Sequence, residues 1–115
     1  MSNHPTRDDA LALLHEYTKS DSLRRHALGV EQAMLKMAEK YGGDLNEWGI
    51  AGLLHDFDYE MYPTIEEHPY KGNEILKERG FPETICKAIM GHATYTGVPR
   101  DTDMAKALFS VDELT

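Results

Sequence analysis

The chain has 115 residues, enough for one domain with one hydrophobic core, and 41% of them are apolar, as in soluble globular domains. Its net charge of −8 argues against binding to nucleic-acid polymers or anionic membranes, because no cationic field would attract a polyanion. No apolar run approaches the ~18 residues of a membrane span, and the single cysteine, Cys86, favours a reducing cytoplasm.

Two helices are predicted in the first third of the chain. Asp8-Asp9 open a short first helix, whose apolar residues are Leu11, Leu13 and Leu14. Ser20 or Asp21 can cap a long second helix, which Tyr41-Gly42-Gly43 ends. The inward face of this second helix is expected to carry residues at helical spacing, which are His26, Val30, Ala33, Met34 and Met37.

Four further helices are predicted after this one. Asp44 caps a third helix that leads to His55-Asp56. A fourth begins near Pro69, which suits a first helical position, and ends at Arg79-Gly80. A fifth runs from 82 to about 92, and a loop over 94–101 leads to a sixth from about 102. Because no β-alternation is long enough for a sheet, the sequence predicts an all-α bundle of five to six or more helices.

The sixth predicted helix has no Gly or Pro stop signal before the last residue. Its apolar face still requires packing partners; this face consists of Met104, Ala105, Leu108 and Phe109. We therefore expect residues 1–115 to be a single helical domain that forms the N-terminal portion of a longer chain and is truncated at its C-terminal end.

Six residues with metal-binding side chains stand at inward-facing positions or near predicted helix ends. They are His26, His55, Asp56, His68, His92 and Asp112. Burying so many polar groups would be costly unless a metal ion took up their lone pairs. Any one histidine alone could be a hydrogen-bonded core residue, and Asp112 alone could be a surface residue of a last turn. Ligands that converge from several helices are a common way to hold a metal in a helical core.

Four of these residues occur in an order that is known from one family. His26, the pair His55-Asp56 and then Asp112, together with the segment Gly52-Leu53-Leu54-His55-Asp56-Phe57, resemble the HD-domain superfamily of metal-dependent phosphohydrolases. The resemblance covers the chain from about residue 8 to its end. It implies an all-α bundle of five or more helices around a central metal, with these four residues as direct ligands.

The other two histidines fit a longer pattern found in dinuclear members of the superfamily. His68 and His92 fall in the right order, and His68-Pro69-x-x-Gly72 is similar to the segment around the third ligand there. Those members include cyclic-dinucleotide phosphodiesterases, diadenosine-tetraphosphate hydrolases and a few di-iron oxygenases, and Asp56 would bridge their two metals. The chain has Asp58-Tyr59 where the phosphodiesterases usually have Gly-Lys, and it lacks their Gly-Tyr-Pro motif, which argues against a cyclic-dinucleotide substrate.

The resemblance implies a metal-dependent hydrolase of phosphoric ester or anhydride bonds, acting on a small nucleotide or other phosphate ester through a metal-bound hydroxide. Histidine and carboxylate ligands suit one or two ions of Mn, Fe, Co, Ni or Zn better than Ca. Asp56 and Asp58 are the candidate catalytic residues; Asp58 would be a base or a partner of a ligand, or else a solvated loop residue. Two alternatives stay open, a di-iron oxygenase on the same scaffold and a non-catalytic, metal-stabilised ligand-binding or regulatory domain.

A small phosphorylated substrate would require cationic partners. Arg24 and Arg25 directly precede His26, and one of them should point toward the site. Arg25, Lys71 and Arg100 are the candidate substrate-binding residues, and the alternative for each is an ordinary solvated surface cation. The loops near the candidate ligands also hold aromatic residues that could stack a nucleobase, shield the pocket or simply pack; they are Tyr59, Tyr62, Tyr70 and Tyr95.

Overall fold

The computed structural model describes residues 5–62, 64 and 66–114, apart from the side chains at 94 and 112–114. The helices in this part of the chain are α1 (Arg7–Tyr17), α2 (Asp21–Tyr41), α3 (Leu45–Leu54), α4 (Tyr70–Glu78), α5 (Glu83–His92), the 3₁₀ helix η1 (Thr94–Thr96) and α6 (Asp103–Leu114). The described residues contain no strand, so the predicted all-α class and the order of the six helices are confirmed. None of these helices combines the length and the apolar content that a membrane span requires.

Side chains cap the amino ends of the first three helices, and α1 begins slightly before the predicted Asp8-Asp9 start. The Thr6 hydroxyl accepts a hydrogen bond from Asp9 N at the start of α1. Ser20, rather than Asp21, caps α2, and Asp44 caps α3. Each such cap contributes about 1 kcal/mol and satisfies a backbone N–H that the helix itself leaves unpaired.

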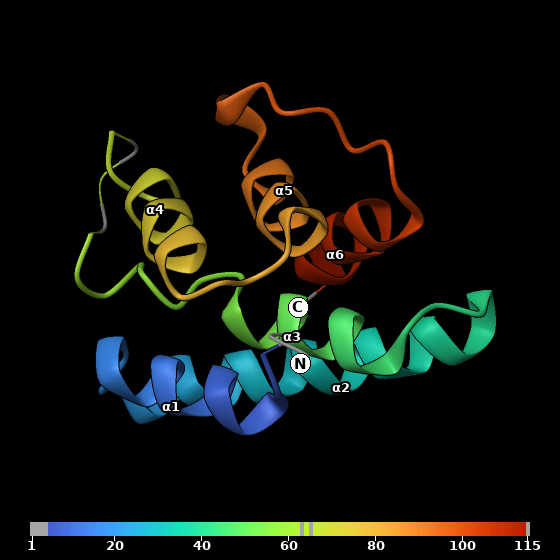
Figure 1. Ribbon diagram of the computed structural model, residues 1–115, viewed down its shortest axis with the longest axis horizontal. Helices are drawn as coiled ribbons and strands as arrows, with labels where there is room; N and C mark the ends of the chain where they lie inside the picture. Colours follow the sequence, from blue (N-terminus) through green and yellow to red (C-terminus); the bar gives the residue numbers. More distant parts are fainter. Residues whose placement is uncertain (1–4, 63, 65, 115) are drawn as a thin grey trace.

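Helix α3 lies at the centre of the fold (Figure 1). It packs against α1 and α2 on one side and against α5 and α6 on the other, while α4 packs on α5. Gly52 lets α2 cross α3 closely, because a Cβ there would lie 2.9 Å from Met34 Cγ and 3.0 Å from the Val30 carbonyl oxygen. This close crossing brings His26 of α2 beside His55, the residue that ends α3.

The buried face of α2 is rotated relative to the predicted one. Ala33 and Met37 of the predicted face are only partly buried. The residues that α2 buries are Ala27, Val30, Glu31, Met34 and Ala38. The difference arises because Glu31 turns inward, where its carboxylate accepts hydrogen bonds from Arg7 Nε at 2.5 Å and Arg7 Nη2 at 3.0 Å. A charged residue can occupy such a position when it is paired.

We expect Arg7→Ala to lower the free energy of unfolding by about 1–3 kcal/mol, because it leaves a buried carboxylate without its partner. Only 2% of the Glu31 side chain is exposed. Arg79→Ala is the matched control, since the Arg79–Glu16 pair is exposed at both ends and such pairs contribute about 0–1 kcal/mol. Urea unfolding of both variants measures the difference. If both variants lost the same free energy of unfolding, burial of Glu31 would not be the reason for the destabilisation by Arg7→Ala.

Candidate metal centre

Five of the six predicted metal ligands meet in one cluster. They form two groups that share Asp56, one with His26 and His55 and the other with His68 and His92. Within each group, one nitrogen or oxygen atom from each residue lies within 4.8 Å of the others. The sixth residue, Asp112, belongs to α6, but its side chain lies outside the described part of the chain.

Asp56 turns a different carboxylate oxygen toward each pair of histidines. Its Oδ2 lies 3.3 Å from His55 Nε2 and 4.0 Å from His26 Nε2, and these two nitrogens are 3.2 Å apart. Its Oδ1 lies 3.2 Å from His68 Nε2 and 3.1 Å from His92 Nε2. Two donor atoms about 2.1 Å from the same ion lie about 3.0–3.4 Å apart at angles between 90° and tetrahedral. All of these separations but the 4.0 Å one match that spacing.

Two contacts between distant segments fix the residues after Asp56 against the start of α2. The buried hydroxyl of Thr18 donates to the Phe57 carbonyl at 2.8 Å. Glu60 accepts hydrogen bonds from Lys19 N at 3.0 Å and Ser20 N at 2.8 Å, and these bonds lower the pKa of its carboxyl. The segment after Asp56 is thereby tied to the start of α2, which carries His26. Thr18 and Glu60 were not among the predicted site residues, because no local pattern reveals contacts across some forty residues.

In three of the histidines, the Nδ1 atom, which lies away from the cluster, donates a hydrogen bond to the protein. The acceptors of the Nδ1 protons are Gly52 O for His55 at 2.7 Å, Ile89 O for His92, and Asp58 Oδ1 for His68 at 2.6 Å. Carbonyl and carboxylate oxygens only accept hydrogen bonds, so each Nδ1 carries a proton. The Nε2 atom of each ring therefore faces the cluster, as an N–H donor when the ring is protonated and as a lone-pair donor to a metal when the ring is neutral. Histidines that bind metals in proteins are oriented in this way.

The cluster favours a positive charge between its donor atoms. Burial acts to raise the pKa of Asp56, but hydrogen bonds from His55, His68 and His92 outweigh it and hold this pKa well below its ordinary range. Burial also acts to lower the pKa of His68, whereas its hydrogen bonds with Asp56 and Asp58 raise it to about 9. A divalent cation would supply the positive charge that this arrangement of an ionised carboxylate and lone pairs requires.

Asp58 is buried, with 1% of its surface exposed, so the alternative of a solvated loop residue is wrong. One of its oxygens accepts from His68 Nδ1 and the other accepts from Gly72 N at 3.0 Å. Both oxygens are therefore engaged with the protein. Of the roles considered for Asp58, this favours a hydrogen-bonding partner of a ligand over a general base.

The predicted substrate-binding cations stand in different surroundings. Arg100 Nη1 donates to the Gly91 carbonyl at 2.7 Å, and the guanidinium lies over the Phe109 ring at 4.0 Å, so the side chain is held between α5 and α6. Arg25 is exposed and its Nε donates to a carbonyl of its own helix at 3.4 Å. Lys71 is exposed in the first turn of α4. Substrate binding by these three residues stays a prediction.

Two of the four predicted tyrosines contact His68. The Tyr59 ring meets the imidazole edge to face, with 5.6 Å between ring centroids, and the Tyr95 hydroxyl donates to the His68 carbonyl at 2.5 Å. Both tyrosines remain exposed. An aromatic rim therefore borders the His68 side of the cluster.

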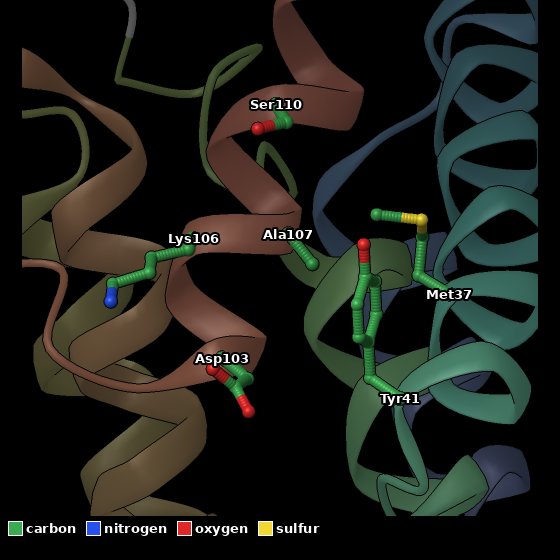
Figure 2. A pocket seen from close by; sticks show the side chains of 6 residues that line it. All are labelled: Met37, Tyr41, Asp103, Lys106, Ala107 and Ser110. Atoms are coloured by element: carbon green, nitrogen blue, oxygen red, sulfur yellow. The ribbon is translucent and has the colours of Figure 1, made fainter.

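A separate groove of about 250 Å³ lies between α2 and α6 (Figure 2). Met37 and Tyr41 line it from α2, and the α6 side consists of Asp103, Lys106, Ala107 and Ser110. None of these residues belongs to the five-residue cluster, so the groove and the candidate metal centre are different features.

The family model described as "HD domain" matches residues 23–113, which include all six predicted ligands. The chain belongs to the HD-domain family. This HD domain is also similar to the symmetrical bis(5'-nucleosyl)-tetraphosphatase of Staphylococcus aureus (strain NCTC 8325 / PS 47), with 35% identity over 74 residues that cover 58% of this chain. The chain spans 38% of the length of that relative. The comparison with solved structures found no match to this chain.

We expect added Mn²⁺ to raise the melting temperature of the metal-free HD domain, and a chelator to reverse the rise. Binding to the folded state alone adds about 2.7 kcal/mol of stability at a hundredfold excess over Kd. His26→Ala should weaken this response, whereas His15→Ala, at an exposed position of α1, should leave it as in the wild type. Thermal unfolding with and without Mn²⁺ tests this. A wild-type melting temperature that does not respond would argue that the cluster is a metal-free part of the core.

Proposed function

We propose that residues 1–115 form the catalytic HD domain of a metal-dependent phosphohydrolase that cleaves an ester or anhydride bond of a small nucleotide. The position of Asp56 between two pairs of histidines carries this proposal. Membership of the HD-domain family supports phosphohydrolase chemistry, and the tetraphosphatase name of the relative supports a nucleotide as substrate.

In this proposal Asp56 would contribute to the binding of two divalent cations. His26 and His55 would hold one ion with Asp56 Oδ2, and His68 and His92 would hold the other with Asp56 Oδ1. Asp112 would add a carboxylate from α6. Imidazole and carboxylate donors suit Mn, Fe, Co, Ni or Zn.

Such ions polarise a phosphoryl oxygen and lower the pKa of water toward 7. The protein supplies metal-binding atoms whose positions are fixed. The Nδ1 hydrogen bonds of His55, His68 and His92 prevent the rings from turning, so their Nε2 atoms need no reorganisation before the reaction. Asp56 stays ionised over the whole neutral range, because its pKa lies well below the ordinary one.

We expect the metal-loaded protein to hydrolyse a dinucleoside tetraphosphate or a mononucleotide, and a chelator to abolish turnover. His55→Ala should lower kcat by about 100-fold or more, since losing a direct ligand should exceed the 10–100-fold effect of an outer hydrogen-bonding partner. His15→Ala should retain wild-type activity. Chromatographic separation of nucleotide products measures the rates.

The same assay separates the two alternatives. Tight nucleotide binding without turnover at full metal occupancy would favour a ligand-binding domain. Bound iron with O₂ consumption and no phosphate-bond cleavage would favour an oxygenase. Hydrolysis that continues after exhaustive chelation would contradict the proposed metal-dependent reaction.

Tyr59 supports a nucleoside as part of the substrate. Its exposed ring lies against His68, so a base attached to a phosphate at the cluster would find an aromatic face close by. Stacking of a base on an aromatic side chain contributes about 1–3 kcal/mol.

We therefore expect Tyr59→Ala to raise KM for nucleotides about tenfold while leaving KM for inorganic tripolyphosphate unchanged. Tyr59→Phe should keep the wild-type KM, because it retains the ring. Tyr41→Ala removes an exposed tyrosine fifteen positions beyond His26 on α2 and serves as the control. Equal effects of Tyr59→Ala on both substrates would exclude base stacking.

A further inference from the structure

His68 differs from His55 and His92 in where it stands relative to a helix. His55 and His92 lie at the carboxyl ends of α3 and α5, where backbone carbonyls lack partners within the helix. Each of these two rings uses such a carbonyl, three residues before it, to fix its Nδ1 proton. His68 instead precedes α4, and the amino end of a helix offers unpaired N–H groups rather than carbonyls. The acceptor for His68 must come from elsewhere in the chain.

Asp58 supplies this acceptor and also satisfies the helix. Its Oδ1 lies 2.6 Å from His68 Nδ1, and its Oδ2 accepts from Gly72 N at 3.0 Å. Gly72 is the third residue of α4, so its N–H is one of those that have no partner within the helix. One buried carboxylate thus joins the ring of His68 to the first turn of α4.

Gly72 provides the space for this carboxylate. A Cβ at position 72 would lie 2.7 Å from both Asp58 Cγ and Asp58 Oδ2, closer than real Cβ contacts. The glycine four residues after His68 therefore has a structural reason: any larger residue would push Asp58 away from the ring.

We propose that Asp58 is a positioning residue that orients His68 toward the metal ion this histidine would bind, and that the absence of a side chain at Gly72 leaves space for the Asp58 carboxylate. The carboxylate fixes the ring orientation and keeps the proton on Nδ1, so that Nε2 is available to the ion. This inference rests on the proposed function, because it takes His68 as a ligand. It adds that one of the two ions depends on Asp58, whereas the other, held by His26 and His55, does not.

Asp58→Asn tests the proposal without relying on activity. The amide oxygen can accept from His68 Nδ1 or from Gly72 N but not from both, and its NH₂ group would face the remaining donor. We expect a calorimetric titration of the metal-free variant with Mn²⁺ to show that one ion binds about 10–100-fold more weakly than in the wild type, while the affinity for the other ion is unchanged. Asp101→Asn, which changes an exposed carboxylate paired with Lys87, should bind both ions as the wild type does.

Gly72→Ala tests the same inference with Asp58 intact. It should weaken the same ion, whereas Gly29→Ala should not, because a Cβ at position 29 meets no atom within 4 Å. If Gly72 acts only by making room for Asp58, the double variant with Asp58→Asn should bind the ion no more weakly than Asp58→Asn alone. The melting temperature of each metal-free variant separates loss of folding from loss of the ion.

Unchanged binding of both ions in Asp58→Asn would overturn the inference and leave the proposed function standing. Equal weakening of both ions would also overturn it, because it would show a general structural role for Asp58. A wild-type protein that binds no Mn²⁺ after reconstitution would overturn the proposed function and this inference together.

Discussion

The carboxylate of Asp56 is the constraint on which the rest of the structure depends. It is ionised and largely buried, and a buried charge is costly unless opposite charge or hydrogen bonds compensate for it. Its two oxygens face donors from four places in the chain, which are α2, the end of α3, the segment before α4 and the end of α5. Since Asp56 directly follows His55, the end of the central helix fixes both residues together, and the other helices pack so that their histidines reach this point.

Helix ends supply most of the groups that orient the histidines. The carbonyls of Gly52 and Ile89 are left over where α3 and α5 end, and each orients a histidine of its own helix at no cost to other hydrogen bonds. His68 has no such carbonyl, and a side chain takes its place. The site therefore needs one buried acid, Asp58, in addition to its metal ligands. Because a side chain can be mutated and a backbone carbonyl cannot, the half of the site that contains His68 should be more sensitive to mutation than the half that contains His26 and His55.

Local signals made the fold predictable, because caps and apolar spacing act within one or two turns of a helix. Asp44 marks the start of α3 in the sequence and in the structure, and the start of α2 was predicted to within one residue, at Ser20 or Asp21. The order of the histidines likewise predicted which residues lie together at the cluster. Burial of Glu31 and Asp58 was not predictable in this way, because each charge is tolerated only through a distant partner: Arg7 lies 24 residues before Glu31, and His68 lies ten residues after Asp58. Tertiary pairing overrides residue polarity at both positions.

The distribution of cations bears on how a phosphate would be held. The chain has a net charge of −8, and two arginines close to the candidate ligands in sequence are committed to backbone carbonyls: Arg24 to Thr18 O at 2.7 Å and Arg100 to Gly91 O at 2.7 Å. Both contacts engage the guanidinium groups with the backbone, which leaves neither arginine with an unengaged guanidinium fork for a phosphate. Divalent ions at the cluster would add to the attraction of an anionic substrate, because they would reverse the local field of an acidic protein. Substrate affinity and metal occupancy should for this reason be coupled in the proposed enzyme.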